Sequence, residues 1–218
     1  MHELLRRVQW MDELPGGVHE SICAEAYETH HAKGETVSRF GDPPQSWIGV
    51  ADGLLKICRV ERCGRGMMLT GVPQGRWIGE AAIVRGDARR YDIVAVRTSR
   101  LVHIPVATFR RLLDTSVEFS RVVLSQLHER VSQSIELVGI DRLDDPVARV
   151  ARTLATVFEP LPHMHLPLSQ SELGDLVGLS RQCVSGALKQ LRRQGLVTAE
   201  YGHVVLKDVD ALRTYRAT

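Results

Sequence analysis

The chain has 218 residues and lacks any apolar run of about 18 residues, the length that a helix needs to cross a bilayer core. Its opening stretch, MHELLRRVQWMDELPGG, carries charges in every turn and has no apolar segment of the kind found in signal peptides. We therefore expect a cytoplasmic protein with no membrane partner. Its hydrophobic content of 44% and charged content of 25% are ordinary for a globular chain, and its length allows one large domain or two small ones.

Cysteine is also scarce. The four cysteines are Cys23, Cys58, Cys63 and Cys183. They are too few for a disulfide framework, and we expect reduced thiols in a cytoplasmic protein. Cys58 and Cys63 are spaced C-x4-C without the second pair that a zinc or iron–sulfur site needs, so no metal site is predicted.

Catalytic motifs are missing as well. The sequence contains no Walker loop, no G-x-S-x-G and no H-E-x-x-H, and GRWIG at 75–79 is a turn and not a dinucleotide fingerprint. A cupin metalloenzyme would need a paired His-x-His with a later Glu and His inside the strands, and that set is absent. We expect no enzyme activity and no catalytic residues.

Acidic residues are absent from one further place. Between residues 180 and 195 the only charged residues are Arg181, Lys189, Arg192 and Arg193. The chain as a whole carries a formal charge of only +2, so this basic stripe is a local feature. Such a stripe is typical of a surface that meets a polyanion.

The chain up to about Val106 has the composition of short strands. Turn signals such as GDPPQ, ADG, ERCGRG, VPQG and RGDA recur roughly every ten residues, and LLKICRV, MMLTGV and DIVAVRTSRLVHIP read as strands between or after them. This spacing predicts an antiparallel barrel, roll or sandwich.

Helical periodicity begins after Pro105. VATFRRLLDTS predicts a short helix and VEFSRVVLSQLHERVSQSIELVG a long one. Apolar residues recur in the long helix at intervals of seven, with a second and weaker heptad row at Ser120, Leu127 and Ser134. The first row consists of Val117, Leu124, Val131 and Val138. This pattern favours a homodimer that pairs through residues 117–138, and the alternative is a helix that packs only on its own domain.

The last part of the chain has the pattern of a winged helix-turn-helix. A helix capped by Asp144 or Asp145 precedes the Pro-rich connector PLPHMHLPL, where we expect His163 and His165 to be exposed. Ser169 and Glu172 form a capping box, a turn at Gly178 leads to a helix capped by Ser180, and LVTAEYGHVVLKD predicts a hairpin. The fold class is α+β. We expect three parts, 1–114, 115–141 and 142–218, with a hinge near residues 139–145.

The helix after Gly178 is the candidate DNA-reading element. Its Val and Leu residues fall at core spacing, which leaves Arg181, Gln182, Ser185 and Lys189 on the exposed face. Arg and Gln bond bidentately to guanine and adenine edges in the major groove. Three further residues stand at helix N-termini, where phosphate oxygens bind: Ser169, Gln170 and Ser180. The alternative is a helical hairpin used only for packing, and Arg192 and Arg193 serve equally well as partners of the helix dipole.

LSQSELGDLVGLSRQCVSGALKQLRRQGLV closely resembles the helix-turn-helix of the cyclic-AMP receptor protein and fumarate–nitrate regulator (Crp/Fnr) family. The resemblance covers nearly the whole chain. The opening turns of the family's β-roll resemble FGDPPQSWIGVADGLLKI, and the segment that leads into the family's effector pocket resembles QGRWIGEAAIV. This resemblance implies a cyclic-nucleotide-binding-like, double-stranded β-helix roll, a dimerisation helix and a winged helix. The implied function is dimeric, sequence-specific transcription regulation at a near-palindromic DNA site, with RNA polymerase as a partner if the protein is an activator. Gln182 and Gly186 depart from the Glu and Arg of cyclic-AMP receptors, so the family's best-known half-site is not implied.

The resemblance also implies an effector pocket. Gly79-Glu80 matches the pair that meets a cyclic nucleotide's ribose, Arg90 with Arg89 beside it matches the phosphate-binding Arg, and Ser134 matches a hydroxyl that meets the adenine. Tyr91 and Asp92 depart from the pattern, because Tyr is bulky and an aspartate repels a phosphate.

Three alternatives for what the roll senses therefore stay open. The first is a cyclic nucleotide and the second is another small or acidic effector. The third is that the roll binds no small-molecule effector, or that it responds to a redox or haem signal. Cys23 alone does not make an iron–sulfur cluster, and His30, His31 and His103 are available to a haem. Oxidation of Cys183 in the DNA-reading helix would weaken binding, although its default role is packing. A further alternative is a cyclic-nucleotide-binding signalling protein without DNA activity.

Overall fold

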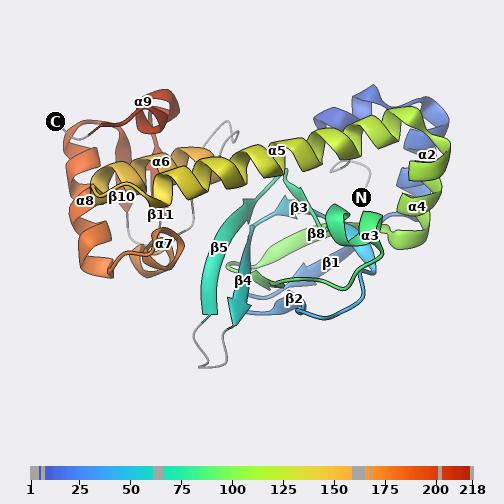
Figure 1. Cartoon of the computed structure of the whole chain (residues 1–218), viewed down its shortest axis with the longest axis horizontal. Helices are drawn as coiled ribbons and strands as arrows, with labels where there is room; N and C mark the ends of the chain where they lie inside the picture. The colour runs from blue at the N-terminus through green and yellow to red at the C-terminus, as the bar shows by residue number, and fades with distance from the viewer. Residues whose placement is uncertain are drawn as a thin grey trace.

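The fold consists of a β-roll, a long helix across one side of it, and a small helical domain at the far end of that helix (Figure 1). The computed structural model describes residue 5 and residues 8–60, 66–158, 165–166, 168–200 and 203–216. Cys63, His163, the tip of the ERCGRG turn and the Tyr-Gly of the last hairpin lie outside the described residues, as does the side chain of His165.

Two four-stranded antiparallel sheets form the roll. One has the order β1 (Tyr27–His31), β8 (Ser99–Pro105), β3 (Ser46–Asp52) and β6 (Trp77–Ile78). The other has the order β2 (Thr36–Ser38), β7 (Asp92–Ala95), β4 (Leu54–Val60) and β5 (Gly66–Pro73). The predicted strand LLKICRV is β4 itself, and the structure confirms the α+β class with an antiparallel roll. The apolar residues between the sheets are Ile48, Val50, Leu55, Ile57, Val72, Ile78, Ile93, Ala95 and Leu101.

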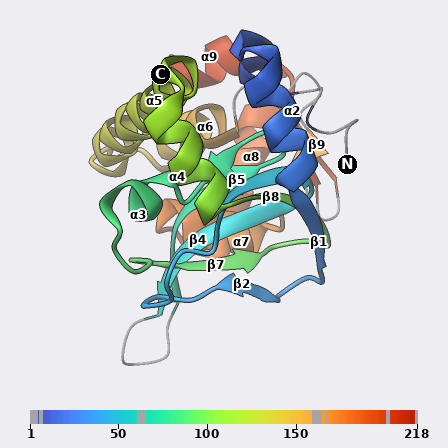
Figure 2. The same ribbon diagram turned by 90° about the vertical axis from the view of Figure 1, so that its right-hand side faces the viewer.

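Helices cover one side of the roll (Figures 1 and 2). They are the 3₁₀ turn η1 (Gln9–Glu13), α2 (Gly16–Glu25), α4 (Val106–Thr115) and the first half of α5 (Val117–Asp141), while α3 (Glu80–Arg85) follows β6. Their core is aromatic, because Trp10 and Trp77 lie against Trp47 at ring-centroid distances of 5.2 and 4.7 Å. Phe109 and Phe119 complete this cluster. None of the described helices is long and apolar enough to span a membrane.

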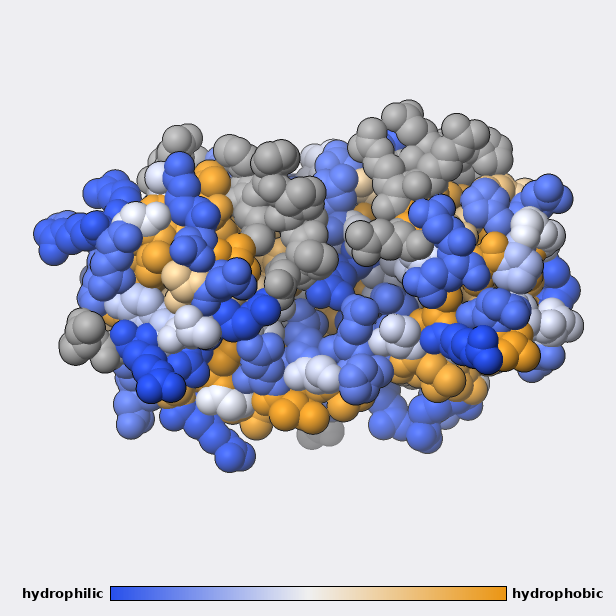
Figure 3. All heavy atoms as spheres, turned by 90° about the horizontal axis from the view of Figure 1, so that it is seen from above, coloured by the Kyte–Doolittle hydropathy of each residue, from blue (hydrophilic) through white to orange (hydrophobic). Residues whose placement is uncertain are grey.

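Helix α5 has two apolar faces. Phe119, Val122 and Val123 are buried against the roll. The opposite stripe is exposed, with Leu124 at 64% and Ile135 at 69%. Hydrophobic residues, drawn in orange, gather along the lower edge of the view in Figure 3. The members of the exposed stripe are Val117, Leu124, Val131, Ile135 and Val138. The heptad row predicted from Val117 is therefore solvent-facing, but its companion row is not the predicted one: Leu127 packs on the roll, and Ile135 supplies the second apolar position instead.

The winged helix follows at the end of α5. Asp145 caps α6 (Pro146–Phe158) by accepting the N–H of Ala148 at 2.7 Å, which decides between the two predicted caps. The remaining elements are β9 (His165–Leu166), α7 (Gln170–Val177), α8 (Arg181–Arg193), β10 (Val197–Glu200), β11 (His203–Leu206) and α9 (Val209–Arg213). The predicted hairpin is β10–β11. The connector holds a strand that the sequence did not indicate, because Leu166 pairs with Val204 and makes β9 the third strand of the wing.

Candidate nucleic-acid interface and effector site

Helix α8 presents the predicted polar face to solvent. The hydroxyl of Ser180 accepts the N–H of Cys183 at 3.2 Å and so begins the helix. Val184, Ala187, Leu188 and Leu191 are buried and hold the helix against the domain. The side chains left exposed are Arg181, Gln182, Cys183, Ser185, Lys189, Gln190, Arg192 and Arg193. This face has four cations and no carboxylate, as the sequence predicted.

Helix α7 begins with the predicted capping box. The Ser169 hydroxyl accepts the N–H of Glu172 at 3.2 Å, and the Ser169 N–H and O–H both donate to Glu172 Oε2 at 2.8 Å. Ser169 and Gln170 are half-buried. The polar hydrogens of Ser169 thus already serve a carboxylate, which makes Ser180 the more open of the two capping hydroxyls for a phosphate.

Glu80 lies at the centre of a buried polar cluster in the roll. Its side chain is 1% exposed and accepts from Trp47 Nε1 at 3.2 Å and from Arg130 Nε at 2.9 Å. Arg130 comes from α5 and also donates to the carbonyl of Trp77. Sequence reasoning missed both donors. The available signal was helical spacing. Arg130 lies three or four residues from Gln126, Leu127 and Gln133, and it therefore shares the face of α5 that meets the roll.

Arg89 is the second charged member of this cluster. It is 3% exposed, and its Nη2 donates to the carbonyl of Ser46 at 2.8 Å. Its Nε and Nη1 make no hydrogen bond of good geometry, although the Tyr91 side chain lies near the guanidinium. Desolvation by burial is the largest influence on the pKa of Arg89 and lowers it, against the opposing effects of Tyr91, Glu80 and Asp42. A buried cation with two nitrogens left without a well-aligned acceptor can bind an anionic group.

Gly79 makes room for Arg89. Its φ of +101° is left-handed, and a Cβ at this position would overlap Nη1 of Arg89. The two residues of the Gly79-Glu80 pair therefore have different roles. Gly79 leaves room for the Arg89 guanidinium, and the Glu80 carboxylate accepts hydrogen bonds from Trp47 and Arg130.

Arg90 and Ser134 stand apart from this cluster. Arg90 is exposed and pairs with Asp87 at 3.2 Å, the arrangement of a solvated basic turn. The Ser134 hydroxyl donates to the carbonyl of Arg130 one turn earlier and is also exposed. The structure therefore brings together Gly79, Glu80 and Arg89, and of the two neighbouring arginines it buries Arg89. The Asp92 carboxylate stabilises the turn that contains Phe40, because it accepts the N–H of Phe40 at 2.9 Å.

Two family models match the chain in succession. Residues 28–116 match the cyclic nucleotide-binding domain, and residues 148–215 match the Crp-like helix-turn-helix domain. The chain belongs to the Crp/Fnr family. It is a DNA-binding transcriptional regulator of Crp type with a cyclic-nucleotide-binding domain, as its resemblance to the family predicted.

Relatives of this regulator agree in sequence and in fold. The cAMP-activated global transcriptional regulator CRP of Salmonella typhimurium is 25% identical over 178 residues, which cover 78% of this chain and 85% of that protein. The cAMP-activated regulator Vfr of Pseudomonas aeruginosa is 26% identical, covering 82% of this chain and 88% of its own length. Among solved structures, FixK2 of Bradyrhizobium japonicum superposes with a TM-score of 0.75 at 20% identity, over 88% of this chain and 98% of its own. The regulator CLP of Xanthomonas campestris, described as c-di-GMP responsive, superposes with a TM-score of 0.66 at 25% identity, over 89% of this chain and 100% of its own.

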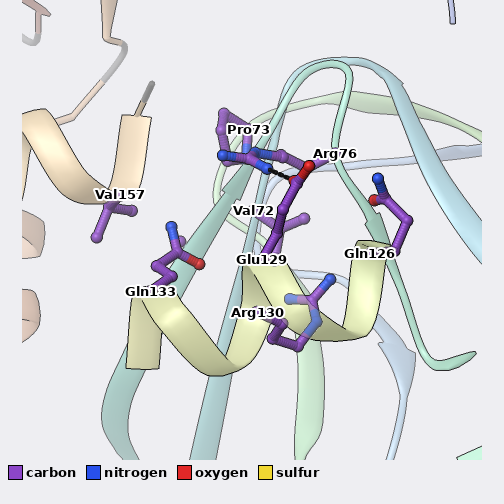
Figure 4. A pocket seen from close by; sticks show the side chains of 9 residues that line it. Val72, Pro73, Arg76, Gln126, Glu129, Arg130, Gln133 and Val157 are labelled. Atoms are coloured by element: carbon purple, nitrogen blue, oxygen red, sulfur yellow. Dashed lines mark hydrogen bonds and ion pairs between the residues drawn. The ribbon is translucent and has the colours of Figure 1, made fainter. Parts of the chain in front are cut away.

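A shallow pocket opens between α5 and β5 of the regulator (Figure 4). Arg76 and Glu129 form an ion pair of 2.8 Å at its edge, and Gln126 and Gln133 line it from α5. Arg130 reaches this pocket, whereas Arg89 does not line it. The pocket thus lies on the α5 side of the buried cluster.

Two of the three histidines weighed as haem ligands, His31 and His103, belong to one hydrogen-bond chain. His103 has Ser46 Oγ at 2.7 Å from Nδ1 and Thr29 Oγ1 at 2.7 Å from Nε2. His31 has Thr29 and Glu35 on its two ring nitrogens, at 3.0 and 2.9 Å. Neither imidazole has a nitrogen left to ligate a metal, and His30 is exposed. Among the described residues no group of three or more His, Cys, Asp or Glu side chains is arranged to hold a metal ion.

Proposed function

We propose that this regulator acts as a homodimer that reads a near-palindromic operator with α8, and that its roll senses a small anionic effector. The observation that carries the DNA-reading proposal is the exposed face of α8, where Arg181, Gln182, Ser185 and Lys189 stand at successive turns without a carboxylate. In the major groove Arg bonds to guanine and Gln to adenine, and Lys pairs with phosphates. Ser180 and Gln170 are proposed as further phosphate contacts, whereas Ser169 is not, because both of its polar hydrogens already donate to Glu172.

The functional parts we propose are the sensing roll at 1–114, the dimer helix and hinge at 115–141, and the DNA-binding domain at 142–218. The cytoplasm is the proposed location. We assign no enzyme activity, and RNA polymerase is a partner if the regulator is an activator.

The test of DNA reading is selection from a randomised duplex pool. The wild-type chain should enrich a site whose two halves are related by a dyad, one helical turn apart. Its affinity should fall steeply with salt, because Lys and Arg contacts release counterions from DNA. Recovery of random sequence after several rounds would show that α8 reads no bases.

Dimerisation is supported by the exposed stripe on α5. Five large apolar side chains along one helix face, all more than half exposed, are costly to leave in water in a monomer. Ile135→Glu or Val131→Glu places a charge in the stripe and should yield monomers in analytical ultracentrifugation at micromolar concentration. Ser132→Glu is the control, because Ser132 is also exposed on α5 but lies outside the stripe.

The effector proposal rests on Arg89. Its Nε and Nη1, which make no hydrogen bond of good geometry and lie beside Glu80 and Gly79, suit a phosphate or carboxylate. Relatives are described as cAMP-activated or c-di-GMP responsive, so both nucleotides are the first probes. Calorimetric titration should give a binding isotherm that Arg89→Gln abolishes. A flat titration with both at millimolar concentration would leave an effector of another class, or none.

A further inference from the structure

Glu172, at the start of α7, is held from the roll as well as from its own helix. Arg97, between β7 and β8, donates through Nη1 and Nη2 to the two carboxylate oxygens, each at 2.7 Å. Lys33, in the turn between β1 and β2, reaches the same carboxylate at 3.5 Å. The side chains of Arg97 and Glu172 are only 21% and 23% exposed, so solvent screens this bidentate pair little. Two separate turns of the roll thus converge on one residue of the DNA-binding domain.

The pair sits at the edge of a packed interface. Val96, the residue before Arg97, and Leu54 at the start of β4 are both buried within the apolar core of the winged helix. On β5, a Cβ at Gly71 would lie 3.1 Å from Val157 and 3.3 Å from Phe158, so α6 approaches that strand closely. Packing alone is non-directional, whereas a bidentate pair has a defined geometry. The interface therefore holds the domains together, and Arg97 with Glu172 selects one orientation of α7 on the roll.

The orientation of α7 determines that of α8. The turn between the two helices is tight, because the Leu179 N–H donates to the Gly174 carbonyl at 3.0 Å and a Cβ at Gly174 would be only 2.7 Å from the Leu179 carbonyl. Figure 1 shows α7 between β5 and α8, with α8 on the outer side. A rotation of α7 on the roll therefore carries the exposed face of α8 with it.

We propose that Arg97 is a positioning residue for DNA binding, which through Glu172 fixes α8 in its DNA-reading orientation relative to the roll. The proposal rests on the proposed reading face of α8. Charge supports this direction, because a bare carboxylate on the first turn of α7 would repel a nearby DNA phosphate, and Arg97 with Lys33 more than neutralises it. Arg97 also follows β7, whose chain begins two residues after Arg90. Strand β7 thus connects Arg89 to Arg97, so a ligand that moves Arg89 can displace the Arg97–Glu172 ion pair through this one short strand.

The test compares Arg97→Gln, Glu172→Gln and the double variant. Gln at 172 keeps a side chain that completes the capping box while removing the charge, so α7 retains its start. Each single variant should bind the selected operator at least about fivefold more weakly, the lower end of ordinary coupling between sites. The double variant should be no weaker than either single one, because both remove the same pair. Arg97→Lys, which keeps the charge, should recover part of the affinity. Arg111→Gln breaks the Arg111–Glu25 ion pair within the roll domain and should leave affinity unchanged.

A spectroscopic measurement reports orientation without DNA. The three tryptophans of the chain form one cluster in the roll, and Cys183 on α8 is exposed while Cys23 and Cys58 are buried. In a Cys63→Ser background, energy transfer from the tryptophans to a fluorophore on Cys183 should differ from the wild-type value in Arg97→Gln and in Glu172→Gln. Unchanged transfer, unchanged affinity or tighter DNA binding in Arg97→Gln would each overturn the proposal. If the wild-type chain selects no operator, the proposed DNA reading fails, whereas the transfer measurement still decides whether Arg97 orients the domain.

Discussion

Arg130 on α5 donates to the carboxylate of Glu80 in the roll, with 2.9 Å between Nε and Oε1. Glu80 is 1% exposed, so removal of this cation leaves a buried carboxylate with Trp47 as its remaining side-chain donor. One residue thus ties the proposed dimer helix to the proposed effector site. Any change at Glu80 reaches the helix directly.

Breaking this pair should cost stability. Arg130→Met is expected to lower the free energy of unfolding by about 3 kcal/mol, because one partner of a buried pair is left alone. Urea titration at fixed protein concentration measures it. Arg76→Met removes the exposed ion pair with Glu129, which also joins the roll to α5, and should change stability by less than about 1 kcal/mol. Equal losses in the two variants would mean that burial of Glu80 is not what matters.

Gly79→Ala should be more damaging than Gly75→Ala. Both glycines have left-handed φ, +101° and +85°, so both substitutions strain the backbone by about 1 kcal/mol or more. Only at Gly79 does a Cβ also meet Arg89, because at Gly75 nothing lies within 4 Å. The difference in unfolding free energy between the two variants isolates that overlap. Arg89→Ala combined with Gly79→Ala should recover part of it, and no recovery would place the clash elsewhere.

Acidification should destabilise the protein through His103. Burial, with smaller effects of His31 and Arg89, lowers the pKa of His103 from 6.5 to about 4. His103 is therefore protonated in the unfolded chain below pH 6.5, whereas in the folded chain it stays neutral until the pH falls to about 4. Stability that is complete above pH 6.5 is lost as the pH falls through this window, by on the order of 3 kcal/mol. His103→Gln should flatten the curve of unfolding free energy against pH between 6.5 and 4, and an unaltered slope would exclude His103 as its source.

Glu172 should act in a lower window. Burial by itself raises the pKa of Glu172, but the hydrogen bonds from Arg97 and Ser169 outweigh burial and lower the pKa from 4.5 to about 2. A depressed carboxyl pKa contributes stability above pH 4.5 that disappears as the pH falls toward 2, on the order of 3 kcal/mol. The unfolding free energies of wild type and Glu172→Gln, measured by chemical denaturation, should therefore converge as the pH falls from 4.5 toward 2. A constant difference down to pH 2 would contradict the assignment.

On DNA, Arg181→Ala should weaken binding to the selected operator by about 1–3 kcal/mol and relax the preference at one base pair. Lys189→Ala should weaken binding to all DNA sequences by the same factor and reduce the salt dependence of the affinity, as expected for a phosphate contact. Electrophoretic shift with the operator and single-base variants measures both. If Arg181→Ala keeps full sequence preference, the reading face of α8 has been assigned wrongly.

Local sequence signals located most of the elements. Strand composition between turn signals, a period of seven, and capping residues such as Ser169 and Ser180 predicted β4, α5, α7 and α8, because these elements depend on neighbours within a few residues. Strand β9 escaped prediction, since it is two residues long and exists only through its pairing with β11. The companion row on α5 was also predicted wrongly, because whether Leu127 or Ile135 faces solvent depends on what the roll covers.

The sequence by itself determined the family, the class of function and the polar face of α8, because the residues that carry them lie close together along the chain. Tertiary structure decided the buried charges. Arg89 and Arg90 are neighbours of the same type, and only folding shows that one is buried beside Gly79 while the other pairs with Asp87 in solvent. Likewise, Arg130 reaches Glu80 across 50 residues and Arg97 reaches Glu172 across 75. Electrostatic partners of this kind are set by distance in space, which no local pattern encodes.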